Sequence, residues 1–213
     1  MNKELDDFLH FNSIDKNNGS VDEEDTSEIE KFIISDYPSI YSILKSNGGK
    51  SFENGLFRIH TFGSSATWSN FIREYFPEFE KNIYCFGYDW MGCMYCFSSD
   101  EEPTIYIFDP ADMDTREAEA TIIDFFNVDL VKYRDDTLLY GRFKKLRKLL
   151  QLNILDVDKC LGYEESLFLG GEDIDANFGI FDIEVYWELQ QKIFQKIQDL
   201  PDGAEVGDII MED

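Results

Sequence analysis

The sequence predicts an α+β fold in which an antiparallel β-sheet, built around a central hairpin, is flanked by several helices. The hairpin is the clearest signal, because the strand-like runs 83–88 (IYCFGY) and 93–98 (CMYCFS) flank a four-residue connection. Apolar residues at helical spacing recur on both sides of this region. With 213 residues, 43% of them hydrophobic, the chain is long enough to bury a sizeable core. We therefore expect a single compact unit made of two intimately packed halves.

The chain is expected to begin with an acidic, loosely ordered arm over residues 1–26. Within this arm, Leu5, Phe8 and Leu9 are spaced as in one short amphipathic helix. The remaining residues of the arm are polar and charged, which disfavours a packed structure of their own.

Helix and strand signals follow the arm. Ser27 and Glu30 form a capping box that opens a helix, and Pro38 restarts a helix that ends at the glycine pair 48–49. Residues 56–60 (LFRIH) alternate as in a strand.

A longer helix is expected next, before the sheet continues. Thr67 is placed to cap it, aromatic and aliphatic side chains share one of its faces, and Pro77 ends it. After the central hairpin, residues 104–108 (TIYIF) supply a further strand.

Helical signals return in the C-terminal part of the chain, over residues 117–126 and 135–152. Residues 164–171 (EESLFLGG) are expected to form a short strand that runs into a tight glycine turn. Asp182 is then placed to cap a last amphipathic helix.

Charge is the most unusual property of the composition. The 19 Lys and Arg residues face 44 Asp and Glu residues, so the formal net charge is −25 and the pI is near 4.2. Such a surface repels phosphate backbones and anionic lipids, which argues against nucleic acid and membrane as partners. A protein with a basic surface is the natural complement.

The segments expected of exported or membrane proteins are missing from the sequence. No run of 18 apolar residues occurs, and the first residues are acidic where a signal peptide is basic and then apolar. We therefore expect a cytoplasmic protein whose four cysteines are reduced thiols.

Cys93 and Cys96 form a CxxC pair, which is a pattern of zinc and redox sites. They fall within a strand, however, where residues three apart face opposite sides of the sheet. No helix begins at the pair, and no second pair of soft ligands lies at zinc-site spacing. We expect buried thiols here, and no metal.

A second metal-like pattern lies in the C-terminal half. Asp173, Asp175 and Asn177, with Glu184 further on, have the oxygen spacing of a calcium loop. The sixth position, which needs glycine, is Phe178. A solvated acidic loop is the better interpretation.

Nothing in the chain assembles a nucleophile, a base and an oxyanion hole. His60, on an alternating strand, is expected to be structural rather than a general base. Phosphate-loop, dinucleotide and nucleophile-elbow motifs are absent. We expect no enzyme, no catalytic residue and no cofactor.

Five bases gather on one helix, where they are expected to balance acids of the same chain: Arg142, Lys144, Lys145, Arg147 and Lys148.

Two groups of motifs resemble known families. Residues 160–173 (CLGYEESLFLGGED) and 182–187 (DIEVYW) resemble the C-terminal domain of type VI secretion immunity proteins. Upstream, the glycine pair 48–49, residues 52–60 (FENGLFRIH) and residues 85–92 (CFGYDWMG) resemble the GAD-like domain that precedes it.

The resemblance spans about residues 30–203 and implies two parts, a GAD-like half over 27–115 and an immunity-protein half with an acidic tail over 116–213. It implies a protein of bacterial competition that binds and neutralises a secreted toxin. The known member of the family neutralises a DNase effector, so a nuclease is the first candidate for that toxin. The chain departs from the family at residues 164–166, where a basic residue and a proline are common.

The expected contacts with the toxin are acidic and aromatic. Trp90, at the hairpin tip, is an anchor if it is exposed, and the alternative is that it folds back on the sheet. The acids concerned lie in residues 164–175, residues 112–119 and the C-terminal tail, and the leading candidates are Glu164, Glu165, Glu172, Asp173 and Asp175. Two other functions stay open: a metal-binding or enzymatic protein that uses the Cys93/Cys96 and Asp173/Asp175 clusters, and a general protein-interaction scaffold.

Overall fold

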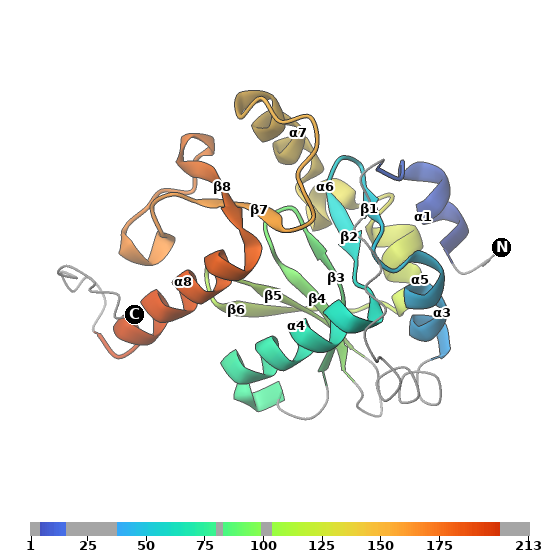
Figure 1. Ribbon diagram of the computed structural model, residues 1–213, viewed down its shortest axis with the longest axis horizontal. Coiled ribbons are helices and arrows are strands. Elements are labelled where there is room, and N and C mark those ends of the chain that lie inside the picture. Colours follow the sequence, from blue (N-terminus) through green and yellow to red (C-terminus); the bar gives the residue numbers. More distant parts are fainter. Residues whose placement is uncertain (1–4, 16–37, 80–82, 99–103, 201–213) are drawn as a thin grey trace.

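A computed structural model describes residues 5–15, 38–79, 83–98 and 104–200 (Figure 1). Its centre is a six-stranded antiparallel sheet in which each strand pairs with the next along the chain. The strands are β1 (Ser51–Phe52), β2 (Phe57–Ile59), β3 (Ile83–Asp89), β4 (Met94–Ser98), β5 (Ile105–Asp109) and β6 (Asp114–Ala118). A second, two-stranded sheet joins β7 (Lys159–Tyr163) and β8 (Phe178–Asp182). The α+β prediction is confirmed.

The helices lie on both faces of the large sheet. They are α1 (Asp6–Phe11), α3 (Pro38–Asn47), α4 (Phe62–Tyr75), α5 (Ile122–Asp124), α6 (Arg134–Thr137), α7 (Tyr140–Leu149) and α8 (Ile183–Ile197). Shorter turns of helix are η2 (Pro77–Phe79), the π-helical η3 (Phe125–Asp129), η4 (Leu167–Leu169) and η5 (Asp175–Asn177). Helices α4 and α8 cover one face, and the helices from the N-terminal and middle parts of the chain cover the other (Figure 1).

The central hairpin forms where the sequence predicts it. Cys85 of β3 lies opposite Cys96 of β4, and a bulge separates Cys85 from Gly87. Gly92 closes the connection with φ of +83°, in the left-handed region that favours glycine. Successive side chains along these strands point to opposite faces of the sheet, so they belong to two different hydrophobic cores.

The core under α4 and α8 is built on the last helix. Tyr186 and Trp187 are buried against Met94 and Cys96, so the aromatic pair of the DIEVYW motif belongs to the interior. Asp182 caps α8 by accepting from the backbone N–H of Glu184 and of Val185, as predicted.

The opposite core takes up the start of the chain. Leu5 is fully buried, and Phe8 packs edge-on against Phe52 at 4.8 Å and Phe126 at 5.1 Å between ring centroids. The predicted short helix is confirmed as α1, but the expectation of a loosely ordered arm is wrong for residues 5–15. Their few apolar side chains are enough to dock them. Residues 16–26 and the expected helix start at Ser27 lie outside the described residues.

Hydrogen bonds join the C-terminal part of the chain to the central hairpin. Trp187 Nε1 donates to the carbonyl oxygen of Gly92 at 2.8 Å. The backbone N–H of Leu161 donates to the carbonyl oxygen of Trp90, also at 2.8 Å. Buried Arg58 donates through Nη2 to the carbonyl oxygen of Leu155 at 2.8 Å. The two halves therefore share their cores and hydrogen bonds.

Two helix predictions are wrong in their boundaries. Helix α4 begins after Thr61, whose side chain exchanges capping-box hydrogen bonds with Ser64, and not after Thr67. The first turn (FGSS) has a single large apolar side chain, Phe62, so it does not extend the apolar helical pattern that the later residues show. The expected helix 135–152 is broken into α6 and α7 at Leu139, which has φ of +48°.

Two strand assignments also differ from expectation. Residues 114–118 (DTREA) form β6, where a helix had been expected to start by 117, because pairing with β5 outweighs an exposed and charged sequence. The strand expected over 164–171 lies at β7 instead, and residues 167–169 form η4, closed by Gly170 in the left-handed conformation.

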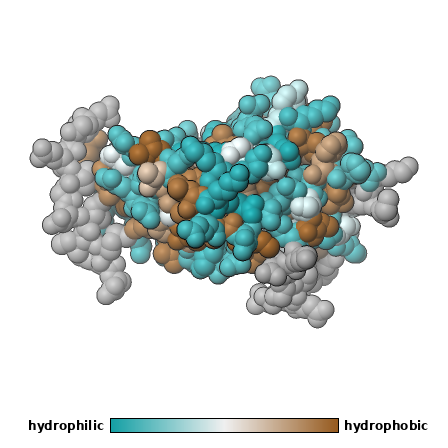
Figure 2. Space-filling model, turned by 90° about the horizontal axis from the view of Figure 1, so that it is seen from above, coloured by the Kyte–Doolittle hydropathy of each residue, from teal (hydrophilic) through white to brown (hydrophobic). Residues whose placement is uncertain are grey.

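Within the described ranges, no helix is both long and apolar enough to cross a bilayer. Figure 2 shows one face of the molecule, on which hydrophilic residues predominate and hydrophobic residues form smaller, separate areas.

Candidate functional site

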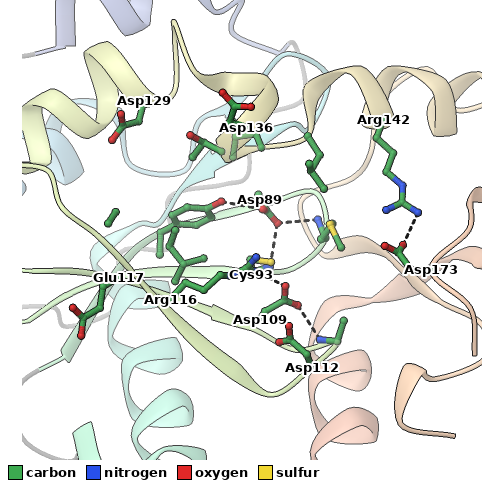
Figure 3. A pocket seen from close by; sticks show the side chains of 18 of the residues that line it. Asp89, Cys93, Asp109, Asp112, Arg116, Glu117, Asp129, Asp136, Arg142 and Asp173 are labelled. Atoms are coloured by element: carbon green, nitrogen blue, oxygen red, sulfur yellow. Dashed lines mark hydrogen bonds and ion pairs between the residues drawn. The ribbon is translucent and has the colours of Figure 1, made fainter. Parts of the chain in front are cut away.

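An acidic cleft of about 460 Å³ opens between the central hairpin, the β5–β6 turn and the α6–α7 segment (Figure 3). Carboxylates from several parts of the chain converge on it. They are Asp89, Asp109, Asp112, Glu117, Asp129, Asp136 and Asp173, and they share the lining with two bases, Arg116 and Arg142. Apolar side chains such as Ile107 and Phe125 complete the walls.

Asp89 forms the floor of the acidic cleft at the end of β3. Its carboxylate accepts from the backbone N–H of Met91 at 2.9 Å, from that of Cys93 at 3.1 Å and from Tyr95 Oη at 3.0 Å. The side chain thus closes the hairpin as an Asx turn. Burial, with a further contribution from Asp109, raises the pKa of Asp89 to about 7, although these three hydrogen bonds oppose the shift.

Asp109 and Asp112 come from the turn after β5. Asp109 accepts from the backbone N–H of Ala111 at 2.9 Å and pairs with Arg116 at 2.5 Å. Partial burial and the neighbouring Asp109 raise the pKa of Asp112. Asp129 ends η3, and partial burial raises its pKa as well. Burial is thus the main cause of the raised pKa of each of these three carboxyls, Asp89, Asp112 and Asp129, and Asp109 adds to it for the first two.

Helix α7 supplies bases that neutralise the loop after η4. Arg142 pairs with Asp173 at 2.6 Å and with Asp175 at 3.1 Å, and Lys145 pairs with Asp175 at 2.5 Å. The bond from Arg142 lowers the pKa of Asp173, and the bond from Lys145 lowers that of Asp175. For Arg142 and Lys145, the expectation that the basic helix balances acids of the same chain is confirmed.

The calcium-like pattern holds no free set of ligands. Asp173 also accepts from Tyr163 Oη at 2.7 Å, in addition to its ion pair. The amide of Asn177 donates to the carbonyl oxygens of Glu165 and Glu172 and accepts from the backbone N–H of Glu165. Protein groups therefore bond to oxygens of Asp173, Asp175 and Asn177 that a cation would need.

Trp90 is fully buried, so the expectation that it contacts a partner is wrong. Its Nε1 donates to the carbonyl oxygen of Leu138 at 2.7 Å, and its ring lies 5.4 Å from that of Phe143 and 5.9 Å from that of Phe178. The second alternative from the sequence, a tryptophan folded back on the molecule, is the one observed. α7 and β8, far along the chain, cover the hairpin tip.

Cys93 and Cys96 belong to cores on opposite faces of the sheet, so the two thiols do not converge on one site. All four cysteines are buried and unpaired. Burial raises the pKa of Cys93 and of Cys96 well above the usual value, which leaves both as unreactive thiols.

The acidic cleft gathers only part of the predicted contacts. Asp173 lines it, as do Asp112 and Glu117 from the acidic stretch 112–119. The remaining candidates are outside its lining, with three side chains exposed and one half-buried: Glu164, Glu165, Glu172 and Asp175. The C-terminal tail lies outside the described residues.

Sequence reasoning missed four acids of the acidic cleft: Asp89, Asp109, Asp129 and Asp136. Each stands at the end of a strand or in a short helix, where an acid is ordinary turn or cap chemistry. A signal was present for two of them, because Asp89 and Asp109 both end apolar strands, β3 and β5, that run in the same direction on either side of β4. The ends of two such strands at the same edge of a sheet bring their side chains together.

Comparison with known proteins places the fold. No family model matches the chain, and no curated protein matches its sequence. Among solved structures, it is similar to the crystal structure of Atu4351 from Agrobacterium tumefaciens, with a TM-score of 0.60 and 13% sequence identity. The match covers 88% of each chain. At this identity, the similarity establishes a shared fold alone.

Proposed function

We propose that this protein is an immunity protein, which binds a cognate toxin in the cytoplasm of the cell it protects and neutralises it by covering its active site. The observation that carries the proposal is the acidic cleft. Its seven carboxylates meet two arginines, and each arginine is already paired, Arg116 with Asp109 and Arg142 with Asp173. Asp89 is buried and hydrogen-bonded, so the negative charge that is left to meet a basic partner is that of Asp112, Glu117, Asp129 and Asp136, which have no ion pair in the described part of the chain.

A nuclease toxin fits this charge best. Such an enzyme needs a basic groove to hold phosphates, and an acidic surface can occupy the groove in place of nucleic acid. With a net charge of −25, the whole protein also attracts a basic partner over distance, which accelerates encounter at low salt. Exposed Leu139 and half-buried Ile107 in the wall add apolar area from which a partner can exclude water.

The resemblance to type VI secretion immunity proteins supports the same function. Its motifs contribute to the scaffold behind the acidic cleft. Trp187 of one motif bonds to Gly92 of another, and Tyr186 Oη accepts from the backbone N–H of Tyr163 at 3.1 Å. These motif residues thus have a structural role that requires no catalytic function, as expected of a protein that acts by binding.

Co-expression with the product of the adjacent gene tests the proposal. We expect the protein to rescue growth of cells that make this toxin and to co-purify with it. If cells are not rescued and no complex forms, the immunity function is refuted, and the general interaction scaffold takes its place.

A matched pair of variants tests the interface. In the cleft variant, Asp112→Asn, Asp129→Asn and Asp136→Asn remove three lining charges, and we expect rescue to be lost. In the control, Glu74→Gln, Glu78→Gln and Glu188→Gln remove three exposed charges elsewhere, and we expect full rescue. Equal rescue by both variants would exclude the acidic cleft as the interface.

A further inference from the structure

A second cavity, of about 280 Å³, lies on the face of the sheet that α4 and α8 cover. Its wall brings together the end of β2, the first turns of α4, β3, the loop before β7 and the start of α8. The residues that matter chemically are His60, Ser64, Trp68, Tyr88, Asp158 and Glu184. None of them lines the acidic cleft.

His60 is the distinctive residue of this second cavity. Its side chain is 1% exposed, its ring stacks on that of Tyr88 at 4.8 Å, and Nδ1 lies 3.1 Å from Ser64 Oγ. Within the described residues, the buried Nε2 has no hydrogen-bond partner. A buried polar atom without a partner destabilises the fold, so a ligand that bonds to Nε2 is favoured.

The hydrogen bonding around Ser64 permits Nε2 to be an acceptor. Ser64 Oγ accepts from the backbone N–H of Thr61 at 2.9 Å and lies 3.1 Å from Thr61 Oγ1, whose hydroxyl can also donate to it. When the Thr61 hydroxyl hydrogen points elsewhere, Ser64 Oγ has a second lone pair for His60 Nδ1–H. That tautomer leaves the Nε2 lone pair open. Burial lowers the pKa of His60 to about 3, so the ring is neutral at pH 7 and does not repel a cation.

The charges of this wall are negative. Asp158, Asp182 and Glu184 line it, and Lys159, at 3.3 Å from each of the two aspartates, pairs with both. Glu184 is exposed and has no ion-pair partner in the described part of the chain. A negative wall excludes anions as ligands and leaves one carboxylate for a cation.

Arg58 is the buried base nearest to this wall, with its guanidinium 5.2 Å from the ring centre of Tyr88. It is outside the lining, and its Nη1 and Nη2 donate to the carbonyl oxygens of Leu155, Asp156 and Lys159, whereas its buried Nε has no partner within the described residues. Arg58 therefore holds the loop before β7 in place from outside the cavity lining.

We propose that this cavity binds a guanidinium group, presented by an arginine side chain of a protein or by a free arginine-like amine. A planar guanidinium stacks on aromatic rings such as that of Trp68 and donates up to five hydrogen bonds in one plane. The carboxylate of Glu184 and His60 Nε2 are acceptors on the wall for these donors. The volume suits one side chain. This site is independent of the toxin interface.

Ligand titrations of the full chain, followed by amide NMR shifts and tryptophan fluorescence, test the proposal. N-acetyl-arginine amide is the probe, and its citrulline counterpart is the matched control, because urea replaces guanidinium at nearly the same shape. We expect saturable binding of the arginine probe and binding at least about tenfold weaker for citrulline. Equal binding of the two, or no binding of the arginine probe, refutes the proposal.

Variants and a second ligand complete the test. Glu184→Gln, on an exposed side chain that tolerates change, should weaken arginine binding about fivefold, whereas Glu188→Gln, one turn further along α8, should leave it unchanged. Equal affinity in both variants refutes the site. Free L-arginine identifies the source: tighter binding than the blocked probe indicates a free amine, and equal or weaker binding indicates a protein side chain. Rescue from the toxin should be unaffected by Glu184→Gln.

Discussion

Trp90 donates its indole N–H to the carbonyl oxygen of Leu138 at 2.7 Å, and this bond ties the tip of the central hairpin to the segment between α6 and α7. Leu138 and Asp89, the residue before Trp90, both line the acidic cleft. The bond therefore fixes the distance between two of its walls. A tryptophan that the sequence offers as a contact serves instead to hold the contact surface in shape.

Replacing Trp90 should reduce stability without directly removing a contact to the toxin. Trp90→Phe leaves the carbonyl oxygen of Leu138 buried without its donor, so we expect a loss of about 1–3 kcal/mol in the free energy of unfolding. Trp90→Ala also opens a cavity and should cost about 3–5 kcal/mol. Urea unfolding followed by circular dichroism measures both. A Trp90→Phe protein as stable as the wild type would contradict this role of the bond.

Most of the fold follows from local patterns in the sequence. The hairpin of β3 and β4 and the cap of α8 at Asp182 are visible because apolar period and turn chemistry agree. Strand β6 is not visible, because its residues are polar and only pairing with β5 makes them a strand. The sequence does not reveal the break at Leu139 either, because a leucine normally continues a helix and only its positive φ in the folded chain interrupts this one.

The acidic cleft was predictable only in its charge. The excess of acids is plain from composition, and the stretch 112–119 contributes two of the lining residues. The convergence of Asp89 with Asp136 and Asp173 depends on contacts between residues 47 to 84 positions apart along the chain, for which local spacing gives no signal. The burial of Trp90 depends on the same contacts.

The link between α7 and the acidic loop gives a prediction about ionisation. In Arg142→Gln, Asp173 loses the bond that lowers its pKa, and Asp175 keeps only Lys145. We expect the pKa of Asp173 to rise to its ordinary range and that of Asp175 to rise less. Carboxylate NMR titration of both variants measures this, with Lys148→Gln on the same helix as the control. Unchanged pKa values would contradict the ion pairs.

Two buried groups should give opposing pH dependences of stability. The pKa of Asp89 is about 7 in the folded chain against 3.8 normally, so the folded state holds the extra proton and stability falls as pH rises from 4 to 7. The pKa of His60 is about 3 against 6.5, so the unfolded state holds the extra proton and stability falls as pH drops from 6.5 to 3. Between pH 4 and 6.5 the two effects cancel.

Removing one of the two groups exposes the other. Relative to the wild type, Asp89→Asn should lose about 1.4 kcal/mol of stability for each unit that the pH falls between 6.5 and 4, and His60→Gln should lose as much for each unit that it rises. Other carboxylates contribute equally to all three proteins, so the differences isolate the two sites. Urea unfolding at several pH values measures them, and parallel curves would contradict the buried ionisations.

Salt should slow association with the toxin, because the proposed interface depends on excess negative charge. Screening at high ionic strength removes the long-range attraction, so we expect the association rate constant to fall about tenfold or more between low and high salt, with little change in the dissociation rate. The variant with Asp112→Asn, Asp129→Asn and Asp136→Asn should show a shallower dependence, and the control variant with three exposed charges removed elsewhere should stay closer to the wild type. Stopped-flow mixing with the purified toxin measures these rates. A rate independent of salt would refute imitation of nucleic acid by the acidic cleft, because salt screens the attraction between opposite charges on which such imitation depends.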